Sequence, residues 1–305
     1  MKAGAPFSLR CPRSFLLTAA VSLPFFISAP VAGAASLSVA SLSTVLSDFA
    51  RQVGGDRVQV SDIVRPGVDP HQFEPSPGDV RRVAAADLVL VSGKGLEGYL
   101  SKLEQSAGQE GKFIDVGARL PSQTLQEGEK TVPDPHWWHD VENAKRAVAV
   151  LAEAFSAADG AGREAFEKNA ALARARLDGL EKDLKVKVAE LGRDRRKLVT
   201  SHDAFGYFAH EFGFTIYPIE GITTADQPSA RKVAELVGTI RAQQVKAVFF
   251  ENIENPKVIA EITRETGAKV GGELYADGLG APGTNAATYD GMMRHNVNTM
   301  VDALK

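Results

Sequence analysis

Two short segments of the sequence share the pattern Asp-Pro-His, at residues 69–71 and 134–136. In each segment, proline fixes the backbone angle φ just before the imidazole and disfavours helix for the aspartate in front of it. His71 and His136 are therefore expected on stiff, non-helical loops, which suits metal ligands whose rings are oriented before an ion binds. The aspartate of each segment can accept a hydrogen bond from the other ring nitrogen. For either segment alone, a rigid turn with a solvated histidine is the alternative.

The second segment continues as Trp-Trp-His-Asp, so that His139 lies three residues after His136. The two imidazoles can chelate one ion if the loop is not helical. The same stretch can also be an aromatic corner of the core that happens to contain histidines. The local spacing does not decide between these interpretations.

Another histidine, His202, directly follows the predicted strand KLVT. A side chain at the carboxyl end of a parallel strand is well placed to face a cleft. The alternative is a histidine associated only with the cap of the next helix, which we expect to begin near Ala204 with Ser201 or Asp203 as its cap. His210 lies within that helix, where packing or surface exposure is expected. The glutamate after it is not followed by the second histidine of a zinc-protease motif.

A carboxylate follows the last predicted strand, at Asp277 in the stretch GGELYADGLG. Glycine permits sharp turns and close approach of the backbone, so this carboxylate can reach into an enclosed site. A bare Asp-Gly turn is the common alternative, and the pattern carries little information on its own.

Short β-type segments alternate with helical patterns after residue 35. Strands without strict alternation, separated by helices such as 44–53 and 232–243, indicate parallel sheets covered on both faces, an α/β architecture. Because loops at the carboxyl ends of parallel strands converge, a cleft between the two halves is the natural ligand site. The predicted strands are SLSVA, DRVQVS, ADLVLVSG and KFIDVG in the first half and RKLVTSH, FTIYPIE, VKAVFFEN and AKVGGEL in the second.

The middle of the chain interrupts this rhythm with a long helical pattern. After a break at residues 159–162, apolar residues recur at helical spacing for roughly 28 residues, or about 40 Å of helix. A helix of this length between two βα series is predicted to link two lobes, whereas the alternative is a surface helix packed on one of them. The expected apolar stripe comprises Phe166, Leu172, Leu177, Leu180, Leu184 and Val188.

The first 35 residues differ from the rest and are predicted to be a secretory signal peptide. Basic residues precede an apolar run over about 14–31, and small residues suited to a signal peptidase follow it. A retained membrane anchor is the alternative, which Pro24 and Pro30 disfavour. The only cysteine, Cys11, lies before the apolar run, whereas a lipid-attachment cysteine would have to follow it.

The chain of 305 residues is 44% hydrophobic and 24% charged, the balance of a globular protein with core enough for two modest domains. Its formal net charge is −3, and −6 without the leader, because the leader holds three basic residues and no acidic one. This charge disfavours nucleic acid as a partner. We therefore predict a leader at 1–35, an amino-terminal α/β lobe at 36–160, a connecting helix at 161–192 and a carboxyl-terminal α/β lobe at 193–305.

Four stretches, in this order and with these separations, resemble the zinc- and manganese-binding solute-binding proteins of bacterial ABC transporters, the ZnuA/TroA type: GVDPHQFEPSPGDV, DPHWW, SHDAFGYFAHEFG and GGELYADGLG. The resemblance covers essentially the whole chain after the leader. It implies two βα lobes with parallel sheets linked by one long helix, with a metal site in the interlobe cleft. By residue-level match, it implies His71 and His136 as ligands from the first lobe and His202 and Asp277 from the second.

Three imidazoles and one carboxylate suit Zn²⁺ in tetrahedral geometry. Similar proteins also take Mn²⁺, but those dedicated to manganese tend to carry a carboxylate at the position of His202, so the imidazole favours zinc. In the family pattern the ligand is the histidine of DPH, which makes His136 the expected ligand and His139 a bystander. A ligand role for His139 stays open as the alternative. The two tryptophans between them are expected to pack beneath the loop and exclude water.

The resemblance implies a periplasmic protein that binds zinc with high affinity and delivers it to the membrane permease of an ABC transporter. Manganese, or either metal, is the alternative cargo, and we expect a monomer without catalytic activity. Many zinc importers of this type carry a histidine-rich loop before the second ligand, whereas PSQTLQEGEKTV here contains no histidine. Because protons compete for imidazoles, affinity is expected to fall below about pH 6.5.

Two rival functions use the same residues differently. A secreted metallohydrolase would need Glu251 or Glu273 as its base, but four protein ligands leave no open position for a reactive water. An adhesin or structural α/β protein would use the histidines only for packing. In that case, substitution of His71 or Asp277 would leave the metal content unchanged.

Overall fold

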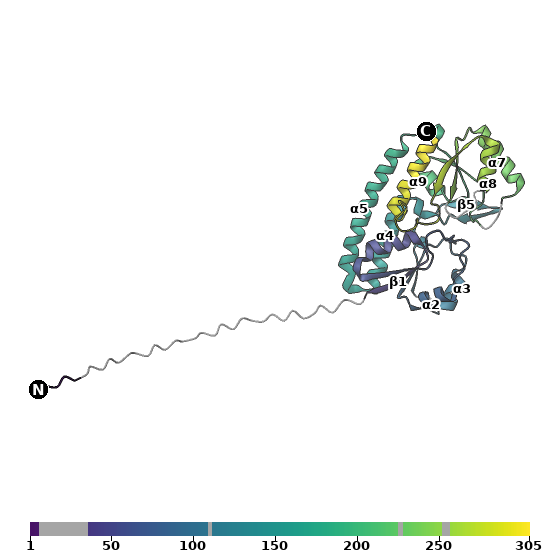
Figure 1. Cartoon of the computed structure of the whole chain (residues 1–305). Helices are drawn as coiled ribbons and strands as arrows, with labels where there is room; N and C mark the ends of the chain where they lie inside the picture. Colours follow the sequence, from purple (N-terminus) through teal and green to yellow (C-terminus); the bar gives the residue numbers. More distant parts are fainter. Residues whose placement is uncertain (6–35, 109–111, 225–227, 252–256) are drawn as a thin grey trace. The chain divides into compact units, whose positions relative to one another are not determined.

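The computed structural model describes residues 1–5, 36–108, 112–224, 228–251 and 257–305 (Figure 1). The apolar part of the predicted signal peptide lies outside the described residues. The described residues from 36 onward belong to one compact unit, which is described below. In the part of the chain that the structure describes, no helix combines the length and the apolar character that crossing a membrane requires.

The amino-terminal lobe is built on a four-stranded parallel sheet with the strand order β2-β1-β3-β4. Strand β3, with the sequence LVLV, is buried at every position, as expected for a strand covered on both faces. The elements are β1 Leu37–Ser41, α1 Thr44–Gly54, η1 Gly55–Arg57, β2 Val58–Asp62, α2 Pro77–Ala85, β3 Leu88–Val91, α3 Leu100–Ala107, β4 Phe113–Asp115 and η3 Gly117–Arg119.

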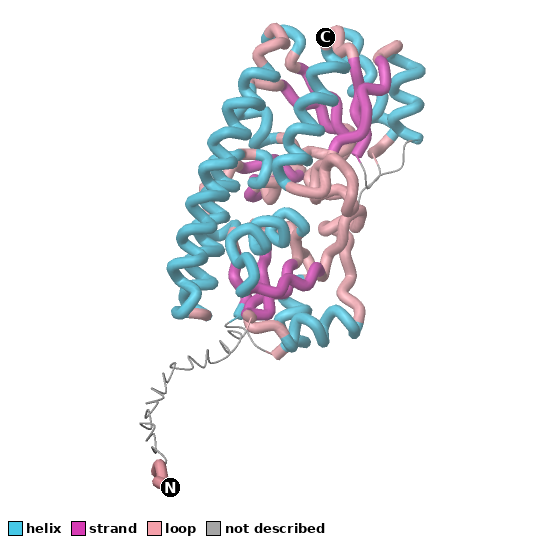
Figure 2. The backbone as a smooth tube through the Cα atoms, turned by 60° about the vertical axis from the view of Figure 1, so that its left-hand side comes forward, coloured by secondary structure: helices cyan, strands magenta, loops and turns pink. Residues whose placement is uncertain are grey.

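The carboxyl-terminal lobe repeats this arrangement with the order β10-β9-β7-β8, again with every neighbouring pair parallel. Figure 2 shows the strands of the two sheets well apart, with helices beside each sheet. All eight strands predicted from the sequence are present in the two sheets. The elements are η6 Arg193–Arg195, β7 Lys197–Thr200, α6 Gly206–Phe212, β8 Thr215–Pro218, α7 Ala230–Ala242, β9 Ala247–Glu251, α8 Lys257–Thr266, β10 Lys269–Leu274 and α9 Tyr289–Leu304.

A hairpin that the sequence analysis did not predict lies between the two sheets, formed by β5 Thr124–Glu127 and β6 Lys130–Pro133. Two residues connect its strands, and the first of them, Gly128, has a φ of +61°, which a residue with a Cβ rarely adopts. A glycine-containing two-residue turn between two short runs was the signal for this hairpin. It leads directly into the segment that carries His136 and the short helix η4 Trp137–His139.

Helices α4 Val141–Ala158 and α5 Arg163–Val188 pack against each other, and η5 Gly160–Gly162 connects them. The 26-residue α5 contacts α1 and α4 of the amino-terminal lobe and α9 of the carboxyl-terminal lobe (Figure 1). It therefore links the two lobes, as predicted. Leu172, expected on the apolar stripe, is instead 54% exposed, because Ala170 and Ala173 occupy the buried positions of that turn.

One apolar cluster is shared by both lobes. It extends from Leu37 in β1 through the buried faces of α4 and α5 to Leu304 in α9. Smaller clusters fill the other face of each sheet, one in each lobe. Because the lobes share packed side chains as well as a covalent connection, large relative rotation would expose apolar surface and is disfavoured.

We expect Leu180→Ala to lower the free energy of unfolding by about 2–5 kcal/mol, because it leaves a cavity in the shared core. Leu180 is 1% exposed, whereas Leu172 on the same helix is 54% exposed. Leu172→Ala is therefore the matched control, with a change within about 0.5 kcal/mol. Urea denaturation measures both values, and equal destabilisation by the two substitutions would contradict the observed orientation of α5.

Candidate metal centre

The structure brings four side chains that are distant in sequence to one place: His71, His136, His202 and Asp277. One potential ligand atom from each lies within 4.8 Å of the corresponding atom of every other. His71 is on the loop after β2, His202 follows β7, and Asp277 follows β10. These three side chains thus come from carboxyl ends of parallel strands, as expected from the topology, whereas His136 lies between β6 and η4.

The Nε2 atoms of the three imidazoles point at one another. That of His136 lies 3.3 Å from Nε2 of His71 and 3.4 Å from Nε2 of His202. The carboxylate of Asp277 completes the group, with Oδ1 3.4 Å from Nε2 of His136 and Oδ2 3.3 Å from Nε2 of His202. Its Oδ2 lies 3.7 Å from Nε2 of His71. The side chains of His71 and Asp277 are 3% and 1% exposed, so the whole group is removed from water.

The ring of His136 is oriented by Asp134, as the Asp-Pro-His pattern predicted. Oδ1 of Asp134 lies 2.9 Å from the ring Nδ1 and also accepts the backbone N–H of His136, at 2.9 Å. The same expectation is wrong for Asp69, whose Oδ1 accepts the backbone N–H of His71 and not a ring N–H of that histidine. Its Oδ2 instead contacts Gln72 and Thr224. The two identical tripeptides therefore hold their histidines differently.

The ring of His202 is oriented by Glu251, which lies at the end of β9. Oε2 of Glu251 is 2.5 Å from Nδ1 of His202, and Oε1 accepts the backbone N–H of both Ser201 and His202, at 3.1 and 3.2 Å. From the sequence, Glu251 was expected only as the base of a rival hydrolase. A glutamate ending the strand next to β7 was the signal for this contact.

The prediction that Ser201 or Asp203 caps the following helix is wrong. Helix α6 begins at Gly206, and its N-cap position is Phe205, which makes no side-chain capping bond. The amide of Ser201 is bound by Glu251, and the amide of Asp203 donates to the carbonyl of Gly221. These contacts keep residues 201–205 as a loop, so that His202 faces the cluster before the helix starts.

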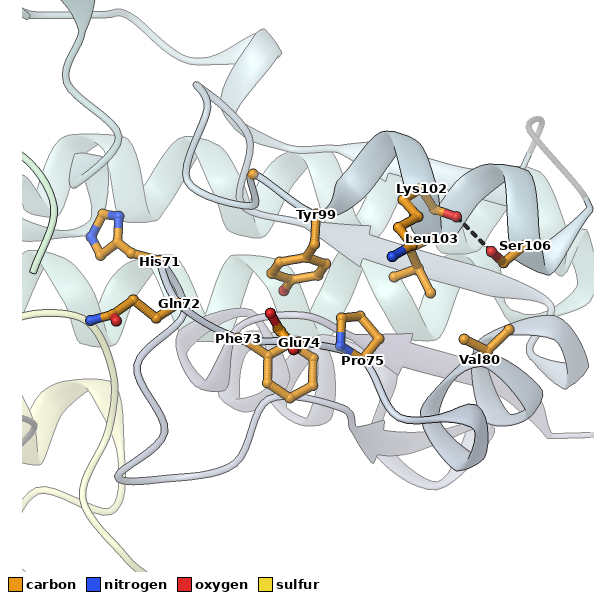
Figure 3. Close-up of a pocket in the computed structure, with 11 residues that line it drawn as sticks. His71, Gln72, Phe73, Glu74, Pro75, Val80, Tyr99, Lys102, Leu103 and Ser106 are labelled. Carbon is orange, nitrogen blue, oxygen red and sulfur yellow. Dashed lines mark hydrogen bonds between the residues drawn. The ribbon is translucent and has the colours of Figure 1, made fainter. Parts of the chain in front are cut away.

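The loop that carries His71 contacts the carboxyl-terminal lobe through Thr224, which accepts a hydrogen bond from Gln72 Nε2 at 2.9 Å. A cavity of about 430 Å³ adjoins this loop within the amino-terminal lobe. Figure 3 shows His71 and Gln72 at one end of it, with Tyr99 and Phe73 farther along. Only His71 and Glu74 among its lining residues carry an imidazole or a carboxylate, so the cavity is not itself a cluster of ligands.

Burial and charge strongly affect protonation in the cluster. Burial alone would lower the pKa of His136, but its hydrogen bonds and charge interactions with Asp134 and Asp277 raise the pKa to about 9. For His202, the opposing effect of the carboxylates of Asp277 and Glu251 likewise exceeds burial and raises the pKa well above its usual value. Asp277 shows the reverse balance, since the imidazoles hold the pKa of its carboxyl well below the usual range despite burial. The ion-free cluster thus favours positive charge among its nitrogens.

His139 is buried but stands apart from the four grouped side chains. Its Nε2 lies 2.9 Å from the carbonyl oxygen of Ala276, and its ring stacks on Phe205 with ring centroids 4.6 Å apart. Burial, followed by the nearby charge of His136, lowers the pKa of His139 to about 3, so this ring is neutral. Trp137 and Trp138 are also buried around this turn, as expected.

A second acidic group, Glu142, Asp178 and Glu181, also has oxygens close together on the outside of α4 and α5. The ammonium of Lys145 already pairs with all three carboxylates. This group is therefore a salt-bridge network with its own cation. His210 is exposed on α6, in agreement with the packing or surface role expected for it.

The sequence matches the family model of the periplasmic zinc-uptake complex component A, ZnuA, over residues 39–303. It is 37% identical over 275 residues to the manganese-binding lipoprotein MntA of Bacillus subtilis, covering 88% of this chain and 90% of that protein. It is also 31% identical over 266 residues to the zinc-binding protein TroA of Treponema pallidum, covering 85% of this chain and 86% of TroA. The solved structure of TroA superposes with a TM-score of 0.83 at 30% identity, over 88% of this chain and 99% of that one.

In the ion-free protein, we expect His136 to keep its second ring proton until the pH approaches about 9. Because this value is above the ordinary histidine pKa of about 6.5, stabilisation by the charged ring is complete below about pH 6.5. That stabilisation is lost as the pH rises through about 9. A histidine NMR titration measures the pKa, and Asp277→Asn should lower it. A wild-type value at or below about 6.5 would contradict these contacts.

Proposed function

Because the chain belongs to the ZnuA family, we propose that it captures a divalent transition-metal ion outside the cytoplasm and delivers it to the permease of an ABC transporter. His71, His136, His202 and Asp277 are the proposed ligands. The single observation that carries this proposal is the convergence of their donor atoms from both lobes at one buried point. The protein would act in the periplasm, where the predicted leader would direct it.

The spacing of the donor atoms supports a transition metal. Bonds of about 2.0–2.1 Å to a tetrahedral ion put its ligand atoms about 3.3 Å apart. Four separations between donor atoms in the cluster are 3.3–3.4 Å and a fifth is 3.7 Å, between His71 and Asp277. A tetrahedral ion would therefore fit after a small shift of the His71 side chain toward Asp277. The carboxylates behind His136 and His202 would hold each ring with Nε2 toward the ion and strengthen it as a donor.

Zinc is the first candidate for the cargo, because three imidazoles with one carboxylate form a borderline donor set that suits Zn²⁺. Manganese is the second candidate, and the observation in its favour is the 37% identity to a protein named as manganese-binding. TroA, named as zinc-binding, is 31% identical. Both oxygens of Asp277 are buried, and no described backbone amide or hydroxyl donates to them. The carboxylate is therefore free to offer one oxygen or two, which accommodates either ion.

A hydrolytic role has less support, because neither glutamate considered as a base belongs to the group of four candidate ligands. Glu251 lies behind His202, bound to Nδ1 and to two backbone amides. Glu273 belongs to β10, before the loop that bears Asp277. The family to which the chain belongs consists of metal-binding transport proteins.

Capture and release would depend on the ion joining both lobes. The shared core and α5 restrict the lobes to small movements, so release would require a local shift of the ligand loops. Of the three histidines, His71 has the least restrained ring. No described residue is hydrogen-bonded to its Nδ1, whereas a carboxylate contacts Nδ1 of His136 and of His202. The contact of the His71 loop with Thr224 through Gln72 would break when this loop moves.

Alanine substitution of each proposed ligand tests the site. We expect His71→Ala, His136→Ala, His202→Ala and Asp277→Ala each to weaken zinc binding by more than about 100-fold, since loss of a ring partner alone costs about 10–100-fold. Isothermal titration with a competing chelator measures the affinities. His210→Ala, at an exposed histidine outside the cluster, is the control and should bind as the wild type does. Wild-type affinity in any of the four variants would remove that residue from the site.

A competition experiment tests the choice of metal. Ion-free protein is equilibrated with equimolar Zn²⁺ and Mn²⁺, and the bound metals are measured by elemental analysis. We expect zinc to predominate, because imidazole-rich sites follow the Irving–Williams order, in which Zn²⁺ exceeds Mn²⁺. Predominant manganese would overturn the zinc assignment, and absence of both metals would overturn the proposed function.

A further inference from the structure

The carbonyl oxygen of Ala276, one residue before Asp277, accepts two hydrogen bonds from the turn that follows His136. Nε1 of Trp138 donates to it at 2.8 Å, and Nε2 of His139 lies 2.9 Å from it. All of these groups are buried. Two residues of the amino-terminal lobe thus hold the backbone from which a carboxyl-terminal-lobe ligand projects.

The contact fixes the tautomer of His139. A carbonyl oxygen can only accept, so Nε2 of His139 must carry the ring proton. Nδ1 then has a lone pair, and it has no hydrogen-bond partner among the described residues. A buried acceptor without a partner is unfavourable, whereas a leucine of similar size would avoid that cost. Within the described part of the chain, the contact with Ala276 is therefore the one polar interaction that the imidazole contributes.

Asp277 depends on its backbone for its position, because within the described part of the chain its carboxylate has only the three imidazoles as polar neighbours. The backbone is fastened on both sides of it. Before Asp277 lies the doubly bonded carbonyl of Ala276, and after it the amide of Leu279 donates to Oγ1 of Thr44 at 2.8 Å. At Gly278 a Cβ atom would lie 2.8 Å from the same hydroxyl, so the close approach to the amino-terminal lobe requires glycine there.

We propose that Trp138 and His139 are positioning residues that bind the carbonyl of Ala276 and thereby hold the carboxylate of Asp277 beside His136. The inference rests on the proposed function, and it adds which lobe holds Asp277 when the ion leaves. Asp277 follows a strand of the carboxyl-terminal lobe but is fastened to the amino-terminal lobe. It therefore stays with His136 when the ion leaves, and loss of the fastening lets the carboxylate move away and the ion escape faster.

The test is the rate at which zinc leaves the full-length protein, measured by stopped-flow mixing with excess chelator. His139→Leu removes the N–H donor and the unpartnered Nδ1 together. We expect it to speed dissociation about five- to tenfold, the effect of losing one of two hydrogen bonds to the carbonyl. His139→Gln keeps an N–H donor at a similar reach and should restore a rate near that of the wild type. Ion-free His139→Leu should unfold at the same temperature as the wild type or a higher one, so that the faster release does not reflect instability.

A tryptophan pair supplies a matched control. Trp138→Phe and Trp137→Phe remove the same atoms from adjacent buried positions, but Nε1 of Trp137 donates to Ser92 and not to the Asp277 segment. We expect faster release only in Trp138→Phe. The absorption spectrum of the Co²⁺-loaded protein should also change in His139→Leu and return in His139→Gln, because it reports the geometry of the ligands.

Three outcomes would overturn the inference. Wild-type release rates in both His139→Leu and Trp138→Phe would show that the contacts with Ala276 do not hold the ligand. Equal acceleration in Trp137→Phe and Trp138→Phe would assign the effect to general packing. A wild-type protein that binds no zinc would overturn the proposed function and the inference together, whereas the first two outcomes leave zinc binding itself intact.

Discussion

The meeting of three imidazole nitrogens and one carboxylate in a space closed to water is the constraint on which the rest of the structure depends. Lone pairs and a carboxylate charge that lie 3.3–3.7 Å apart in a buried cluster are unfavourable without a compensating cation. Protons and a divalent metal ion are alternative ways to supply it. The carboxylates of Asp134 and Glu251, bound behind two of the rings, favour positive charge in either case. Protons therefore compete with the metal ion for these imidazoles up to a higher pH than the ordinary histidine pKa implies.

Two similar sheets assemble the cluster here, because its four donors lie on four different loops. Three of the side chains, those of His71, His202 and Asp277, follow the carboxyl ends of parallel strands. The fourth, that of His136, lies in the turn after the hairpin. Helix α5 and the apolar cluster shared by both lobes keep these ends facing each other. The same packing limits how far the lobes can separate, and under the proposed function an ion would enter and leave through changes in the loops.

Much of this arrangement could be predicted from the sequence, since periodicity identifies buried strands and the Asp-Pro-His pattern identifies a histidine on a stiff loop. The ring contact of Asp134 was predictable because it is local, two residues from its histidine. The contact of Glu251 was not, since 49 residues separate it from His202 and only the pairing of β7 with β9 brings them together. The prediction that Leu172 is buried failed for a related reason. Small alanines occupy the buried positions in that turn of α5, and the sequence alone does not show which face of the helix a neighbour covers. The ligand roles themselves remain a prediction.

The most direct test is a crystal structure of the zinc-loaded protein with anomalous diffraction measured on both sides of the zinc absorption edge. We expect one buried anomalous peak about 2.0–2.2 Å from Nε2 of His71, His136 and His202 and from a carboxylate oxygen of Asp277. A peak at another position, or a peak bonded to fewer than three of these four side chains, would contradict this expectation.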